Sequence, residues 1–123
     1  MKKLFLIFGA LNGLIAVALG AFGAHGLEGK ISEHAISIWE KAVQYQMFHT
    51  MALLAAGIVF YKVKSLSLNA SGWLFFIGII IFSGSLYTYA ITGVTFFAII
   101  TPLGGIAFLL GWILLGYAVV KHL

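Results

Sequence analysis

The chain of 123 residues contains no cysteine, no arginine and no aspartate. Without cysteine it has no disulfide, no thiolate metal site, no iron–sulfur cluster and no thiol nucleophile. All seven basic residues are lysines, so the bidentate phosphate contacts that arginine makes are excluded. The acidic residues are three glutamates, and all of them fall between positions 25 and 41. These absences remove much of the metal, redox and nucleotide chemistry open to a protein of this size.

Charge of either sign is scarce. Only 8% of the residues are charged, whereas 63% are hydrophobic. A soluble domain this small needs far more polar surface to cover its core. The composition therefore predicts a membrane protein. The net charge of +4 comes from scattered lysines and not from a basic face, which indicates membrane topology and predicts no nucleic-acid partner.

Four apolar runs are long enough to cross a bilayer, which requires roughly 20 residues. They cover residues 4–24, 42–61, 72–91 and about 97–120. None contains a formal charge. The sequence predicts one all-α domain, a multi-pass bundle of four transmembrane helices.

The lysines orient these spans. On one side of a four-span chain lie Lys2, Lys3, Lys62, Lys64 and Lys121, and on the other side lie Lys30 and Lys41. Lysine is enriched in cytoplasmic loops. We therefore expect both termini in the cytoplasm and the segment 25–41 outside the membrane.

That outer segment has an amphipathic pattern. Its apolar residues recur at helical spacing from Ile31 to Ala42, so the second helix is expected to start before its span. Ser37 and Glu40 have the spacing of a helix N-terminal capping box. The side chains here that could ligate a metal are those of His25, Glu28, Glu33, His34 and Glu40. Their spacing matches no compact metal-binding motif, so we expect a solvated loop and no metal.

Small residues recur along the spans, often seven positions apart. They include Gly9, Gly13 and Gly20 in the first span, Gly78 in the third, and Gly104 and Gly111 in the fourth. In lipid, helices associate through close packing of small residues, and a period of seven predicts left-handed crossing near +20°. The glycines are expected to pack helices and to leave little room for a wide aqueous pathway.

Polar side chains also occur within the spans. The expected intramembrane cluster consists of Gln44, Gln46, His49, Thr50, Ser85, Thr88 and Thr101. At 1.5 Å of rise per residue, Gln46, His49 and Ser85 lie roughly 7 to 12 Å below the outer boundary. Polar groups at this depth need partners. Two interpretations stay open: a structural hydrogen-bond network, or a polar pocket that opens outward.

Pro102 follows Thr101 near the start of the fourth span. Threonine is a good N-cap and proline suits a first helical turn, so the helix could begin at Pro102. The alternative is a longer helix kinked at the proline. The sequence alone does not choose between them.

No catalytic or cofactor motif is readable in the chain. It lacks GxSxG, HExxH and a P-loop, and we expect no enzyme activity. Bis-histidine haem needs two ligands at one depth, which His25 and His49 do not supply. We expect no cofactor.

Five blocks together resemble the YgdD/YwdK-like family of small bacterial inner-membrane proteins. They are GAFGAHGL (20–27), VQYQMFH (43–49), FSGSLY (82–87), TPLGG (101–105) and GW (111–112). The resemblance implies a four-helix protein of the bacterial inner membrane. It implies no activity, because the function of that family is unknown.

Two classes of function follow from these observations. The first is a structural or accessory membrane component, surrounded by membrane lipids, that acts through homo-oligomers or a partner membrane protein. The second is a small transporter, a channel, or a binder of lipids or small molecules that uses an outward-facing polar pocket. The absence of charge from the spans favours the first.

Overall fold

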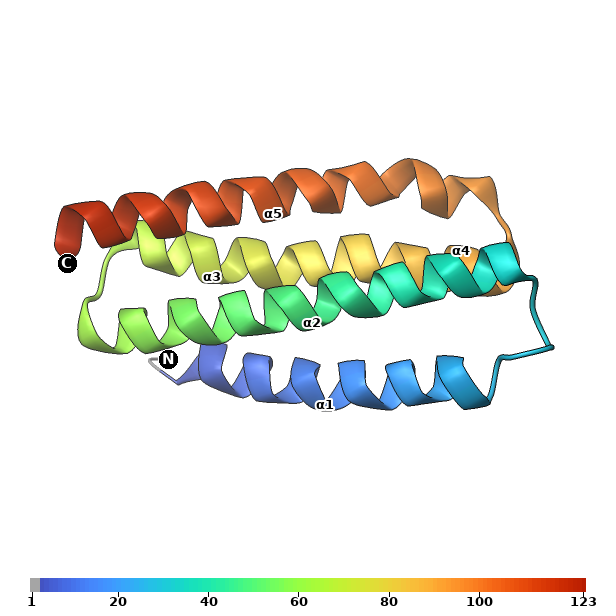
Figure 1. Ribbon diagram of the computed structural model, residues 1–123. Coiled ribbons are helices and arrows are strands. Elements are labelled where there is room, and N and C mark those ends of the chain that lie inside the picture. The colour runs from blue at the N-terminus through green and yellow to red at the C-terminus, as the bar shows by residue number, and fades with distance from the viewer. Residues whose placement is uncertain (1–2) are drawn as a thin grey trace.

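The computed structural model describes residues 3–123, and they are helical with short connections (Figure 1). The elements are α1 (Leu4–His25), α2 (Glu33–Lys62), α3 (Leu66–Gly78), the π-helical segment η1 (Ile79–Ser83), α4 (Gly84–Thr92) and α5 (Thr95–His122). We call the continuous helix formed by α3, η1 and α4 the third span. Four helices in this part of the chain are long and apolar enough to cross a membrane, which confirms the predicted fold class.

Helix α2 begins earlier than the apolar run on which its span was predicted. Its N-cap is Ser32, whose side-chain oxygen accepts a hydrogen bond from the Ala35 backbone N–H at 3.0 Å. The cap expected at Ser37 is wrong, because that residue lies inside α2. Most of the outer segment 25–41 is therefore helix, and the α1–α2 connection is confined to residues 26–32.

Helix α5 runs through Pro102 without interruption. Of the two alternatives left open by the sequence, the structure shows the longer helix, which begins at Thr95. Proline costs this helix one backbone hydrogen bond. Thr101 donates its hydroxyl to the Phe97 carbonyl at 2.9 Å, so its polar group is satisfied within its own helix.

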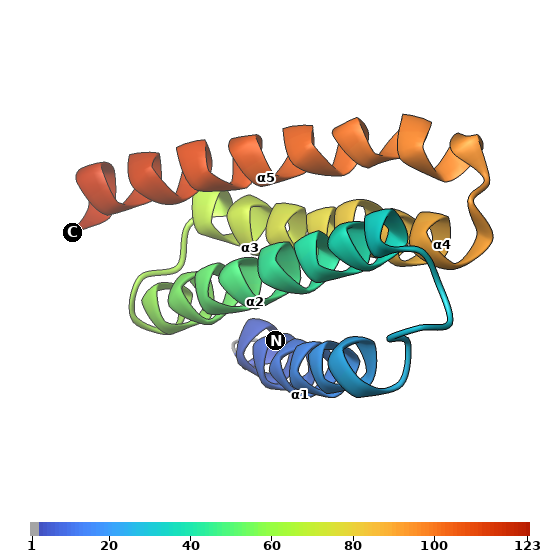
Figure 2. The ribbon, with the colours of Figure 1, turned by 45° about the vertical axis from the view of Figure 1, so that its right-hand side comes forward.

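The helices are arranged around α2 and the third span. Helix α1 packs against α2, while α5 packs against the third span, and α2 also packs against the third span. Helices α1 and α5 lie at opposite edges of the molecule in both ribbon views (Figures 1 and 2). This arrangement leaves α2 with two different sides, one toward α1 and one toward α5.

Glycines let the helices approach closely. A Cβ atom on Gly78 would lie 2.6 Å from the Phe108 ring, and one on Gly111 would lie 2.8 Å from the Phe75 ring. At Gly104 the obstacle is the backbone of Phe82, and at Gly9 it is the Leu54 side chain. These contacts are closer than a side chain at these positions would permit.

The other two predicted packing glycines have more space. A Cβ on Gly13 would lie 3.6 Å from Thr50, and one on Gly20 would lie 3.3 Å from Val43. Both face α2. The tightest contacts of α1 are instead made by Gly9 and by Gly23, where a Cβ would lie 2.5 Å from the Trp39 ring.

The π-helical segment changes the spacing of buried residues along the third span. Leu68 and Phe75 are buried and seven positions apart, and so are Ser83 and Ala90. Phe75 and Ser83 are eight apart, because a π-helix contains an extra residue. Ser83, at the end of η1, donates its hydroxyl to the Ala42 carbonyl of α2 at 2.8 Å.

The two ends of the bundle differ in charge. The end with the α2–α3 connection and the C-terminus, which we call the terminal end, carries Lys3, Lys62, Lys64 and Lys121 (Figure 1). The opposite end, which we call the loop end, carries Lys30 and Lys41. Lys2, which was also counted in the topology prediction, lies outside the described residues.

Candidate functional site: the groove between α2 and α5

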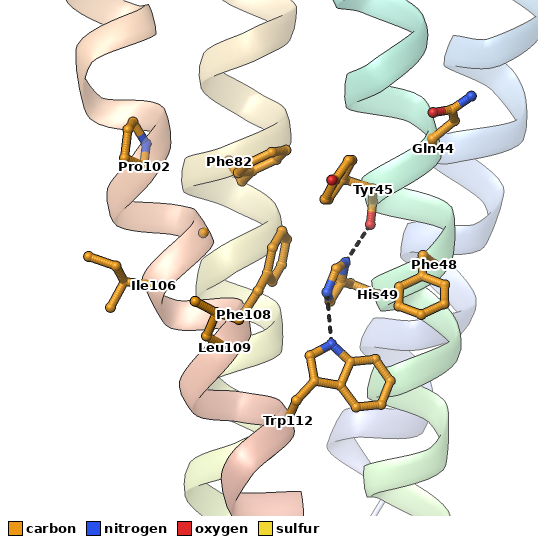
Figure 3. A pocket seen from close by; sticks show the side chains of 11 residues that line it. Gln44, Tyr45, Phe48, His49, Phe82, Pro102, Ile106, Phe108, Leu109 and Trp112 are labelled. Carbon is orange, nitrogen blue, oxygen red and sulfur yellow. Dashed lines mark hydrogen bonds between the residues drawn. The ribbon is translucent and has the colours of Figure 1, made fainter.

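A groove of about 750 Å³ runs between α2 and α5, above η1 (Figure 3). Figure 3 shows Gln44 and Pro102 toward the loop end of the groove and Trp112 at its other end. The lining residues are Gln44, Tyr45, Phe48, His49, Phe82, Pro102, Gly105, Ile106, Phe108, Leu109 and Trp112. The groove has the size and mainly apolar lining of a small-molecule site.

His49 forms part of the groove floor and is only 3% exposed. Its ring stacks on Phe108 with centroids 3.5 Å apart. Its Nδ1 lies 2.8 Å from the Tyr45 carbonyl, and the Trp112 indole donates to its Nε2 at 3.1 Å (Figure 3). A carbonyl only accepts and an indole N–H only donates, so the ring is a neutral imidazole with its proton on Nδ1.

Gln46 belongs to a different set of hydrogen bonds, on the side of α2 that faces α1. Its amide donates to the Asn12 side-chain oxygen at 3.1 Å and accepts from the Tyr87 hydroxyl at 2.7 Å. Asn12 in turn donates to the Phe8 carbonyl at 2.9 Å. Three helices, α1, α2 and α4, are joined by these side chains.

The remaining members of the expected polar cluster are placed elsewhere. Ser85 is hydrogen-bonded to Thr101 across α4 and α5. Thr50 and Thr88 each donate to a carbonyl one turn back in their own helix, at 2.7 and 2.8 Å. The structure therefore divides the expected cluster into separate hydrogen-bonded sets around Gln46, His49 and Ser85.

Gln44 and Tyr45 lie at the loop end of the groove, and they are the exception to this pairing. Both side chains are exposed. Neither the Gln44 amide nor the Tyr45 hydroxyl has a hydrogen-bond partner among the described residues. By contrast, no buried side-chain nitrogen or oxygen in that part of the chain lacks a partner. The groove thus has an apolar body and an unpaired polar end.

Four polar side chains that the sequence singled out in the outer segment stay apart from this groove. They are His25, Glu28, His34 and Glu40, and all four are exposed. Within residues 3–123, no three histidine, aspartate or glutamate side chains gather closely enough to hold a metal ion. These four side chains therefore add charge to the loop end and do not line the groove.

Three hydrogen-bonding side chains at the centre of these sets were missed by sequence reasoning: Asn12, Tyr87 and Trp112. Asn12 carried a readable signal, because an amide in the middle of an apolar run needs a partner on another helix. It also lies between Gly9 and Gly13, on the face that packs. Tyr87 and Trp112 carried no comparable signal, since aromatic residues are common throughout these spans.

A family model described as "Protein of unknown function (DUF423)" matches residues 19–105. The match includes the residues that line the groove from Gln44 to Gly105. The chain belongs to this family. Its description gives no activity, so the groove geometry is the evidence on which a function has to be argued.

Full-length relatives agree with this assignment. A UPF0382 membrane protein of Staphylococcus aureus (strain bovine RF122 / ET3-1) is 54% identical over 97% of both chains. The UPF0382 membrane protein YwdK of Bacillus subtilis (strain 168) is 48% identical over 98% of this chain and 99% of its own. These relatives confirm the predicted family and the membrane class. No solved structure matches the chain.

Proposed function

We propose that the protein is a non-catalytic component of the bacterial inner membrane that binds a membrane neighbour laterally, through the α2–α5 groove. The observation that carries this proposal is the contrast between the groove and the polar sets. The groove has apolar walls and an unpaired polar end, whereas the buried polar side chains are paired with one another. A membrane component that acts through lipids or partner proteins needs such a lateral site.

A non-catalytic role is supported by the way the reactive groups are engaged. Both ring nitrogens of His49 are hydrogen-bonded. The Ser83 hydroxyl donates to the Ala42 carbonyl, and the Ser85 hydroxyl pairs with Thr101. A general base or nucleophile must reach its substrate, and these side chains face protein groups instead.

The topology that we propose puts both termini in the cytoplasm and the loop end outside. The distribution of lysines between the two ends of the bundle supports it. Because the chain contains no cysteine, single cysteines next to Lys62 and next to Glu28 report on the two ends. We expect an impermeant thiol reagent to label intact cells only at the second position. Labelling only next to Lys62 would reverse the topology.

Photo-crosslinking in cell membranes tests lateral binding. A photoreactive residue is introduced in place of either Leu109 or Ile113. Leu109 lines the groove, whereas Ile113 lies on the same helix outside it. The two side chains are equally exposed, at 65% and 64%. We expect one dominant product from position 109 and a broad mixture of neighbours from position 113. Products of equal diversity from both positions would contradict the proposed function.

A further inference from the structure

We infer that the occupant of the groove is one phospholipid of the leaflet at the loop end, with an acyl chain in the groove and its headgroup beside Lys41. This inference rests on the proposed function and names the neighbour that the groove binds. Three features of the structure support it: the walls of the groove, the order of polar groups along α2, and the placement of the glycines.

The walls suit a flexible hydrocarbon chain. Phenylalanine, tyrosine and tryptophan rings line the groove, together with aliphatic residues of α5; the rings are those of Tyr45, Phe48, Phe82, Phe108 and Trp112. The Trp112 indole is held by its hydrogen bond to His49, so the inner end of the groove has a fixed boundary. An acyl chain can follow an apolar cleft of this kind without leaving any polar atom unpaired.

The polar groups follow the order found in a phospholipid. Lys41 lies three and four residues before Gln44 and Tyr45, so all three share one face of α2. Proceeding from the loop end, this face presents a cation, an amide and a phenol, followed by the apolar wall that begins at Phe48. These groups match, in turn, a phosphate, the ester carbonyls and the acyl chain. The amide and the phenol are unpaired within the described residues, as donors to a lipid ester would be.

A transmembrane helix of another protein fits less well. Helices approach each other in lipid through glycine, alanine, serine and threonine. The groove lining includes one such residue, Gly105. The glycines that would serve this purpose, such as Gly78, Gly104 and Gly111, already face side chains or backbone within the bundle. The bulky lining therefore favours a lipid chain over a helix.

Two matched glycine variants test the inference. Gly105 lies in the groove, and a Cβ there would make only an ordinary contact of 3.9 Å with Phe82. Gly116 lies on the same helix with nothing within 4 Å of its Cβ position, and it does not line the groove. Gly105→Phe should fill the groove, whereas Gly116→Phe adds the same ring to an exposed surface.

Native mass spectrometry of the full chain gives the measurement. The protein is purified in mild detergent and mixed with equal amounts of phosphatidylglycerol and phosphatidylcholine. We expect one bound phospholipid per chain. The retained fraction should fall about tenfold in Gly105→Phe and stay unchanged in Gly116→Phe. If Gly105→Phe loses its helical content, Leu109→Trp fills the groove from the lipid side and serves in its place.

Headgroup recognition is tested with the same lipid mixture. A lysine near the surface contributes about fivefold in affinity for an anionic lipid, so the wild-type chain should prefer phosphatidylglycerol by about that factor. Lys41→Gln should abolish the preference, and Lys64→Gln, at the terminal end, should leave it intact. The double variant with Gln44→Leu and Tyr45→Phe should weaken the binding of both lipids equally.

Three results would overturn the inference. Equal lipid retention by the two phenylalanine variants would exclude the groove as the lipid site. An unchanged preference of Lys41→Gln for phosphatidylglycerol would exclude the headgroup contact. A dominant photo-crosslink from position 109 to a protein would show that the groove binds a helix and not a lipid. That protein could be a second copy of this chain. This last result would leave lateral binding through the groove intact, so that failure of the inference and failure of the proposed function are distinguishable.

Discussion

The two sides of α2 differ in how they satisfy polar groups. On the side toward α1 and α4, Gln46 is hydrogen-bonded to Asn12 and Tyr87, and a smaller cavity of about 360 Å³ lies over this set. On the side toward α5, the larger groove ends at Gln44 and Tyr45, whose amide and hydroxyl have no hydrogen-bond partner among the described residues. The first side joins helices of the protein to one another, and the second is open to a neighbouring molecule of the membrane.

Polarity inside a span therefore does not by itself mark a binding site. Gln46 is more deeply buried than Gln44 and has two side-chain partners. In hydrocarbon a paired amide is a structural element, because its donors and acceptors are already used. An unpaired amide beside an apolar cavity is the stronger indication of a ligand.

The sharpest test of the comparison uses two neighbouring glycines. Gly104 faces the backbone of Phe82, while Gly105 faces the groove. Gly104→Ala should destabilise the protein by about 3 kcal/mol, because backbone atoms cannot move aside. Gly105→Ala should change stability by less than about 1 kcal/mol, in the stabilising direction that helix propensity gives. Thermal unfolding in detergent measures both, and equal losses would mean that α5 does not sit on η1 as described.

A second test compares the two glutamines. Gln46→Leu removes the partner of both the Asn12 oxygen and the Tyr87 hydroxyl, and should cost about 2 kcal/mol. Gln44→Leu removes no hydrogen bond within the described chain and should be close to neutral. Reversible unfolding in mixed micelles provides the measurement. A greater loss in Gln44→Leu would reverse the distinction between the closed and open sides of α2.

A third, smaller effect is expected at His49. His49→Leu leaves the Trp112 indole without its acceptor, and since Trp112 is partly exposed the cost should be about 1 kcal/mol. His49→Gln should retain most of the stability, because an amide also donates and accepts. The comparison needs the same unfolding assay, with Trp112→Phe as the partner variant. Additive losses in the double variant would show that the two side chains do not interact.

The smallest effect is spectroscopic. The hydrogen bonds of His49 require a proton on Nδ1 and a lone pair on Nε2. Nitrogen NMR of the ring in micelles should therefore show the Nδ1–H tautomer, and Trp112→Phe should perturb the Nε2 resonance. A ring protonated at Nε2 would contradict the contact with Trp112.

Much of the fold was predictable because the bilayer imposes simple rules. Length and hydrophobicity are sufficient to predict four membrane-spanning helices, and these are seen as α1, α2, the third span and α5. The start of α2 was harder, since Ser32 and Ser37 are both reasonable caps and only tertiary contacts distinguish them. Continuity through Pro102 was also undecidable, because proline suits both a first turn and a kinked helix.

For the site, the sequence predicts the depth of each polar residue but not the direction in which its side chain points. Gln46 and His49 are three residues apart, and depth arithmetic puts them at similar levels. Three residues also rotate a side chain by about 60° around the helix axis. That rotation separates a contact with α1 from a contact with α5. The sequence contains no information on which neighbour lies at which angle, so one cluster was expected where the structure has several.

The π-helical turn also affects which sequence changes the third span can accommodate. Deleting one residue from Ile79–Ser83 would return this segment to an ordinary α-helix and shorten the interval from Phe75 to Ser83 from eight residues to seven, the interval that separates the other buried pairs of the span. Ser83 and Ala90 would therefore stay on the face toward α2. The same deletion within α3 or α4, where no π-helical turn absorbs it, would rotate every residue beyond it by about 100° around the helix axis. The third span should therefore tolerate the loss of one residue at its centre better than the same loss on either side.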